Sequence, residues 1–158
     1  MRVLLIEDDQ FKAAHLMRTL LGLGFEMEIE EAKSVNASLR LLHQSSPYDL
    51  VILDMSLPTF DVGPRESGGR PEGFGGREIM HYIFNSSPHT PVLVVTQFEK
   101  FGEGSNEVDL LTLTGQLQND FPGMMRSLIY YNAASDKWMQ ELECVIKELQ
   151  LNLQEPQP

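Results

Sequence analysis

Three short apolar runs constrain the fold of this chain more than any other feature. They are RVLLI at 2–6, LVIL within 49–54 and VLVV within 91–96. Runs with no polar face are typical of strands that are buried on both sides in a parallel sheet. Segments with helical periodicity or helix-capping residues lie between them, so the sequence predicts strands and helices in alternation.

The full pattern predicts an α/β fold with a doubly wound, five-stranded parallel sheet and helices on both faces. Strands are expected at 2–6, 25–32, 49–54, 91–96 and 127–132. Helices are expected at 10–21, after a cap at Ser34, at about 76–85, at about 107–120, and after a cap at Ser135. The second strand alternates strictly between apolar and acidic residues, which predicts a place at the sheet edge. The first helix is expected to turn Phe11, Ala14, Met17, Leu20 and Leu21 inward.

Length and composition narrow the class of protein. The chain has 158 residues, which predicts a single domain over 1–150 followed by a polar C-terminal tail at 151–158. A net charge of −11 with no basic cluster argues against nucleic-acid binding. No apolar run is long enough to span a bilayer and no signal peptide is recognisable, so we expect a cytoplasmic protein that does not bind membranes. The single cysteine, Cys144, lies among apolar residues and is expected to be a buried thiol.

Acidic residues gather where the predicted strands end. Glu7, Asp8 and Asp9 follow the first strand, Asp54 ends the third, and Thr96 ends the fourth. The carboxyl ends of parallel strands meet at one edge of the sheet, so these acids should crowd one crevice. Capping of the first helix explains Asp9 but not the others. Repulsion among the carboxylates is relieved by a hard divalent cation, and Mg²⁺ prefers oxygen ligands. A carboxylate such as that of Asp54 can then attack a phosphoryl group.

Three motifs, VLLIEDD, YDLVILDMSLP and PVLVVT, together resemble the receiver domain of two-component response regulators. The resemblance spans residues 2 to about 149. It implies a flavodoxin-like sheet with strand order 2-1-3-4-5. It also implies that the chain accepts a phosphoryl group from a sensor histidine kinase or a phosphotransfer protein.

The resemblance assigns roles to individual residues. Glu7 and Asp8 match the paired acids, of which Asp8 is the expected direct Mg²⁺ ligand. Asp54 matches the phosphoacceptor and a further metal ligand, and the Ser56 backbone carbonyl matches a third. Thr96 matches the hydroxyl residue that approaches the phosphoryl group.

The chain departs from the family pattern in its last strand and in one loop. Receivers end the fifth strand with a lysine, and here Asn132 holds that place. The aromatic switch position falls on Ile129, with Tyr130 beside it. A glycine-rich stretch at 61–77, expected to be a mobile surface loop, lengthens the spacing from Asp54 to Thr96. Four other cations lie near enough in the sequence to substitute for the lysine, namely Lys100, Arg65, Arg70 and Arg77.

The function expected is a stand-alone, phosphoaccepting signalling protein without enzyme activity. Its output would pass by protein–protein contact through the fourth helix, fifth strand and fifth helix, a surface through which receivers also form homodimers. Phe98 and Phe101 are expected to take part in a partner contact. The alternative is a phosphorylation-independent, pseudo-receiver adaptor. A phosphohydrolase of the haloacid-dehalogenase type is disfavoured because Ser56 stands where such enzymes need a second acid.

Overall fold

A five-stranded parallel sheet forms the centre of the molecule. The computed structural model describes residues 1–44, 46–61, 63, 75–102 and 104–154. The sheet has the order β2-β1-β3-β4-β7, and every pairing in it is parallel. Its strands are β1 Arg2–Ile6, β2 Glu28–Ala32, β3 Leu50–Leu53, β4 Val92–Thr96 and β7 Met125–Tyr130. The predicted fold class and strand order are confirmed, with β7 as the fifth strand of the sheet and β2 at an edge.

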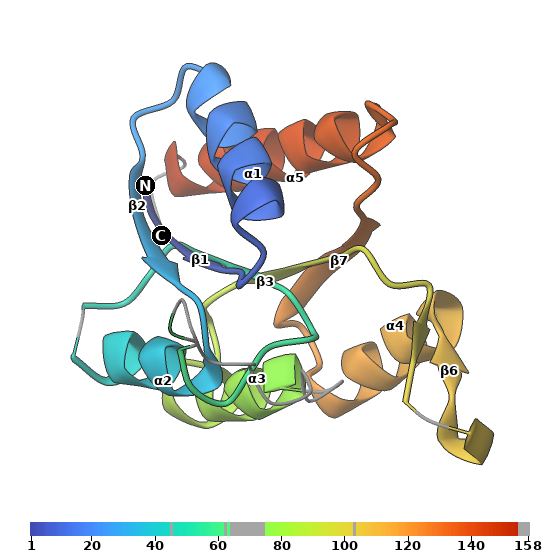
Figure 1. Cartoon of the computed structure of the whole chain (residues 1–158). Coiled ribbons are helices and arrows are strands. Elements are labelled where there is room, and N and C mark those ends of the chain that lie inside the picture. The colour runs from blue at the N-terminus through green and yellow to red at the C-terminus, as the bar shows by residue number, and fades with distance from the viewer. Residues whose placement is uncertain (45, 62, 64–74, 103, 155–158) are drawn as a thin grey trace.

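Helices cover both faces of the sheet (Figure 1). One face carries α1 Gln10–Gly22 and α5 Lys137–Gln154, and the other carries α2 Val35–Gln44, α3 Gly75–Ser86 and α4 Leu110–Asp120. Each face buries its own apolar cluster, because β1, β3 and β4 turn alternate side chains to opposite sides. Helix α5 continues to Gln154, beyond the expected boundary at 150. The end of the predicted tail, 155–158, lies outside the described residues.

A small hairpin precedes α4 and was not predicted. Strands β5 Lys100–Phe101 and β6 Val108–Asp109 pair antiparallel and flank a short 3₁₀ helix, Gly104–Asn106. The helix predicted from about 107 therefore begins at Leu110, and the Asp109 carboxylate accepts a hydrogen bond from the Thr112 N–H at its start. Two-residue strands are too short to show an alternating pattern, so they cannot be predicted from periodicity.

The first helix presents a different face to the sheet from the one predicted. Phe11, Ala14 and Leu21 are exposed, whereas Lys12, Ala13, Leu16 and Leu20 are buried. Of the five residues predicted to point inward, Leu20 is fully buried and Met17 is partly buried. The helix is thus turned by about one residue, which places a lysine on its buried side.

The structure contradicts one expectation that rested on composition. Cys144 is exposed, so the prediction of a buried thiol is wrong. It lies on the outer side of α5, whose inward positions are held by Trp138, Leu142 and Ile146. Among the described residues, no helix is both long and apolar enough to cross a membrane.

Candidate acidic site

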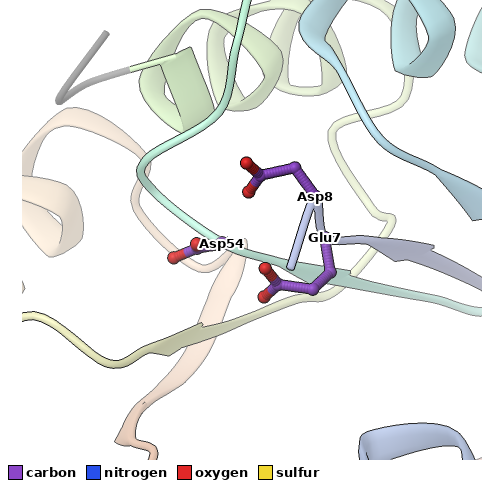
Figure 2. A group of neighbouring side chains, drawn as sticks. All are labelled: Glu7, Asp8 and Asp54. Atoms are coloured by element: carbon purple, nitrogen blue, oxygen red, sulfur yellow. The ribbon is translucent and has the colours of Figure 1, made fainter. Parts of the chain in front are cut away.

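Three carboxylates meet at the carboxyl end of the sheet. Strands β1 and β3 are neighbours, with Ile6 in register with Leu53, so the residues that follow them emerge side by side. Glu7, Asp8 and Asp54 each offer an oxygen within 4.8 Å of the others. Figure 2 shows the three carboxylates turned to the same side. Glu7 and Asp54 are buried and Asp8 is exposed, so the cluster reaches from the core to the solvent.

Backbone hydrogen bonds fix the two strand ends that carry these acids. The Asp54 N–H donates to the Ile6 carbonyl at 3.0 Å, and the Glu7 N–H donates to the Ala32 carbonyl at 3.0 Å. The Asp54 Oδ1 accepts from the Met55 N–H at 2.8 Å, which orients the carboxylate. Asp9 accepts from the first amides of α1, as the capping interpretation predicted. The ladder thus extends one residue past β1 and β3 and holds the acids in place.

Helix α3 packs tightly against the segment that follows Asp54. A Cβ at Gly76 would lie 2.6 Å from the Asp54 carbonyl oxygen, and one at Gly75 would lie 2.9 Å from the Leu57 carbonyl oxygen. The Gly76 N–H donates to the Met55 carbonyl at 3.0 Å. Gly75 and Gly76 therefore belong to a helix start that needs close backbone approach, rather than to a surface loop. Residues 62 and 64–74 of the predicted glycine-rich loop lie outside the described residues.

A buried lysine faces the acids from α1. The Lys12 side chain has no exposed area, and its Nζ lies 2.6 Å from Glu7 Oε2 and 3.5 Å from Asp54 Oδ1. The same ammonium donates to the Val95 carbonyl at 2.8 Å, and it lies 5.9 Å from the centre of the Tyr131 ring. One cation from the first turn of α1 therefore touches three of the central strand ends.

Burial dominates the electrostatics of the cluster. Desolvation raises the pKa of Glu7 to about 7, against the opposing attraction of Lys12. Desolvation also raises the pKa of Asp54, again opposed first by Lys12, and that of the Asp8 carboxyl. The lysine therefore offsets only part of the cost of holding three acids together.

Thr96 ends β4 beside the cluster, where the sequence predicted it. Its side chain is fully buried, and its Oγ1 accepts a hydrogen bond from the Phe98 N–H at 3.2 Å. A threonine hydroxyl that accepts one hydrogen bond still carries a proton to donate. Phe98 is 43% exposed, whereas Phe101, the other expected partner residue, is 3% exposed and packs in the core.

Among the described residues, no predicted substitute for the missing strand lysine reaches the acids. Lys100 pairs with Glu107 in the hairpin, and Arg77 pairs with Asp120 of α4. Arg65 and Arg70 lie outside the described residues. Asn132 is exposed, and its side-chain oxygen accepts from the Ala134 N–H. The cation at the site is Lys12, which sequence reasoning missed because the helix was assigned the wrong inward face.

Ile129, the residue at the expected aromatic switch position, is fully buried in the cluster beneath α1 and α5. The aromatic residues on either side of it differ in exposure. Tyr131 is buried and Tyr130 is 37% exposed. Hence the exposed aromatic ring of β7 lies one residue after the predicted position.

The residues of the cluster fit a hard divalent cation. Among the described residues, the Lys12 ammonium at 2.6 Å is the one group that faces the buried Glu7 Oε2, and no further donor reaches this oxygen. Three carboxylates and one ammonium leave two negative charges when all are ionised. All ligands offered are oxygens, which is the set that Mg²⁺ prefers. Glu7, Asp8 and Asp54 are the side chains that would hold the ion, and Ser56, also buried, stays a predicted backbone ligand.

A doubly wound parallel sheet with a cluster of three carboxylates at the carboxyl ends of β1 and β3 defines a receiver-like class of protein. Comparison with known families identifies it: the model of the response regulator receiver domain matches residues 3–106. The chain therefore belongs to the response regulator receiver domain family. The matched range contains Glu7, Asp8, Asp54 and Thr96 and ends before β7, the strand in which the chain departs from the family pattern.

Individual proteins resemble this chain over nearly its whole length. The Detocs response regulatory protein DtcB of Enterobacter cloacae is 26% identical over 148 residues, covering 92% of this chain and 99% of the relative. The Mn²⁺-bound response regulator Rcp1 superposes with a TM-score of 0.65 at 16% identity, covering 99% and 98% of the two chains. The response regulator TrrA of Thermotoga maritima, solved with Mg²⁺ and BeF, gives 0.60 at 19% identity, covering 94% and 97%.

Proposed function

We propose that Asp54 accepts a phosphoryl group in a Mg²⁺-dependent reaction and that the chain passes this signal on by protein contact. The observation that carries the proposal is the cluster itself. A buried Asp54 lies with two further carboxylates within 4.8 Å, at the sheet edge where doubly wound folds bind ligands. Family membership supports the proposal, since receiver domains act as signalling modules rather than as enzymes.

The chemistry requires a donor with a labile phosphoryl group, either an acyl phosphate or a phosphohistidine of a kinase or phosphotransfer protein. An oxygen of the Asp54 carboxylate forms a bond to phosphorus while the phosphorus–oxygen or phosphorus–nitrogen bond of the donor breaks. The leaving group departs with the electron pair of that bond. Bound Mg²⁺ would neutralise charge on the transferring oxygens. The Met55 N–H holds Oδ1 and so fixes the direction of attack.

Thr96 links the phosphoryl site to the surface. Its hydroxyl accepts from the Phe98 N–H and lies at the end of the strand next to Asp54. A rotation of this hydroxyl toward a phosphoryl oxygen removes the hydrogen bond to Phe98. Phe98 and Tyr130 are both partly exposed, and Tyr130 is in register with Thr96. We infer that phosphorylation is read out at the surface formed around α4, β7 and α5.

A partner would meet apolar side chains on this output surface. Leu111 of α4 is 82% exposed, and Phe98 and Tyr130 add partly exposed rings. The exposure of Leu111 contrasts with the buried Leu113 and Leu117 of the same helix. A downstream protein, or a second copy of the chain, would bury these side chains. Leu111→Ser should weaken such binding without changing phosphorylation of Asp54.

Phosphorylation of the purified chain by a small donor tests the proposal. The chain is incubated with acetyl phosphate and Mg²⁺, and the intact mass is compared between the wild type and Asp54→Asn. The expected result is the gain of one phosphoryl group by the wild type, its loss on chelation of Mg²⁺, and no gain by the variant. A wild type that gains nothing, although it binds Mg²⁺, would favour the phosphorylation-independent adaptor.

A further inference from the structure

We propose that Lys12 of α1 is the phosphoryl-binding cation of this site, taking over from the first helix the role that other receivers give to a lysine of the last strand. The inference rests on the proposed function, because it concerns the same reaction at Asp54. What it adds is a particular residue, on an element that the family pattern does not use for this purpose.

The position of Lys12 supports this role. Its Nζ is 3.5 Å from Asp54 Oδ1, so a phosphoryl group on Asp54 would lie within reach of the ammonium. The Val95 carbonyl, one residue before Thr96, anchors the ammonium at 2.8 Å. Lysine has three donors, and this anchor uses only one of them. The other two face Glu7 and Asp54 and can turn to a phosphoryl oxygen.

The burial of Lys12 sets it apart from the other lysines of the chain. All five lysines lie in the described part of the structure, and Lys33, Lys100, Lys137 and Lys147 are exposed. A fully buried lysine is rare and requires a paired charge. Two aromatic side chains cover one side of the Lys12 ammonium: the Tyr131 ring lies over it and packs on Trp138. The aromatic wall excludes water from one side of the ammonium, which strengthens its attraction for a phosphoryl oxygen.

A simpler role for Lys12 would be to neutralise the acids permanently, in place of a metal ion. The two roles predict opposite effects of removing the charge. If Lys12 only occupies the cation site, then Lys12→Met frees that site, and both Mg²⁺ binding and phosphorylation increase. If Lys12 binds the phosphoryl group, then Mg²⁺ binds at least as tightly in the variant, because a repelling charge has gone, but phosphorylation slows.

The experiment measures both quantities in the full chain. Trp138, the only tryptophan of the chain, reports Mg²⁺ binding by fluorescence, since it contacts Tyr131 beside the ammonium. Intact mass reports the rate of labelling by acetyl phosphate. For Lys12→Met we expect labelling to fall about 10- to 100-fold, the loss of one charge-assisted hydrogen bond in the transition state. The Mg²⁺ affinity should be equal to or higher than that of the wild type.

Lys100→Met is the matched control, because Lys100 is an exposed lysine whose pairing with Glu107 lies in the hairpin. It should leave both quantities unchanged. Labelling of Lys12→Met that equals or exceeds the wild-type rate overturns the inference while leaving the proposed function intact. Loss of Mg²⁺ binding and labelling together also overturns it, since this indicates a merely structural lysine. A wild type that is not labelled at all refutes the proposed function, and the inference with it.

A measurement on the wild type keeps the inference testable if Lys12→Met fails to fold. Carbon-13 at the ε position of lysine gives only five side-chain signals, four of them from exposed residues. Beryllofluoride with Mg²⁺ imitates a phosphoryl group on a carboxylate. We expect one signal, that of the buried lysine, to shift on addition of beryllofluoride beyond its shift with Mg²⁺ alone. Five unchanged signals would overturn the inference.

Discussion

The two ends of β1 both carry ion pairs, and they differ in burial. At the amino end, Arg2 lies 2.7 Å from Glu30 and 3.6 Å from Glu28, and its side chain is 28% exposed. At the carboxyl end, Lys12 lies 2.6 Å from Glu7, and their side chains are 0% and 2% exposed. The distances are alike, so the surroundings, rather than the contacts, separate a surface pair from a site.

Solvent explains what the two ends can do. Water screens the charges around Arg2, whose guanidinium also donates to Glu30 and to the Ser46 carbonyl, and the pairs there contribute little. At the other end, three acids face one lysine in a largely buried cluster, so the unpaired negative charge lowers the free energy of unfolding. This excess of buried negative charge lowers the stability of the fold, but it favours the binding of a cation. The ammonium and the cation together would favour a phosphoryl group. We infer that the carboxyl end of β1 serves to bind ligands, whereas the ion pairs at its amino end connect β1 to the edge strand β2.

The largest expected difference between the two ends comes from removing each cation. In metal-free buffer at alkaline pH, Lys12→Met should lower the free energy of unfolding by about 3–5 kcal/mol, because it leaves buried carboxylates without a partner. Arg2→Met should lower it by about 0–1 kcal/mol. Urea unfolding followed by circular dichroism measures both. Equal costs at the two ends would show that burial does not set them apart.

Magnesium sharpens the same comparison. Added Mg²⁺ should stabilise Lys12→Met more than it stabilises the wild type, since the ion replaces the lost positive charge. Arg2→Met, which changes nothing near the acids, should gain as much as the wild type. A gain that is equal in all three proteins would place the ion elsewhere.

The acids could be predicted from the sequence and the lysine could not, because chain topology places the acids and helix rotation places the lysine. Acids at the ends of buried strands are located by chain topology alone, because parallel strands bring their carboxyl ends together. Lys12 is placed by the rotation of a helix, which is inferred by assuming that charged residues face solvent. That assumption predicted an inward Phe11, whereas Phe11 is 69% exposed and Lys12 is fully buried. Lys12 is buried because it pairs with Glu7 and Asp54, and a prediction based on the apolar face of a helix does not account for such pairing.

The fold was predictable further than the site. Continuous apolar runs such as β3 have few alternatives to a buried parallel strand, and the strand order followed from the family resemblance. The hairpin of β5 and β6 depends on contacts between two-residue strands, which leave no periodic trace. The close approach of α3 to Asp54 depends on the absence of a side chain at Gly76. Because this glycine lies in a glycine-rich stretch, the sequence does not show which of the glycines packs against the backbone.

The pH dependence of stability should also separate the two ends, with about 3 kcal/mol from Glu7 alone. The pKa of Glu7 is raised from 4.5 to about 7 in the folded chain by burial, so the folded state keeps a proton that the unfolded state has released. Its favourable contribution is full below pH 4.5 and is lost as pH rises through about 7. The metal-free wild type should therefore become less stable across this window, measured by urea unfolding at several pH values.

Two glutamine variants isolate the source of this slope. Glu7→Gln should reduce it, while the part of the slope that comes from the raised pKa values of Asp54 and Asp8 persists. Glu30→Gln, at the half-exposed amino end, is the matched control because it leaves the acidic cluster unchanged. An undiminished slope in Glu7→Gln would mean that another group carries the linkage.

Packing at the carboxyl end should matter more than in a helix far from it. Gly76→Ala would place a Cβ 2.6 Å from the Asp54 carbonyl oxygen, so backbone has to move, at a cost of about 1–3 kcal/mol. Gly115→Ala, in α4 with nothing within 4 Å of its Cβ, should instead stabilise the chain by about 0.5–1 kcal/mol. Thermal unfolding measures both effects. A Gly76→Ala variant as stable as the wild type would show that the backbone around Asp54 can move without a cost in stability.

The smallest expected effect is the response of the two ion pairs to salt. Raising the salt concentration from about 0.1 M to about 1 M shortens the screening length from about 10 Å to about 3 Å. The contribution of Arg2, measured as the difference in unfolding free energy between the wild type and Arg2→Met, should fall toward zero because Glu28 and Glu30 are open to ions. The contribution of Lys12, measured with Lys12→Met in the same way, should change little because salt ions do not enter the buried cluster. If the contribution of Lys12 also fell toward zero, ions would have to reach the acids, and the buried pair would differ from the surface pair in degree only.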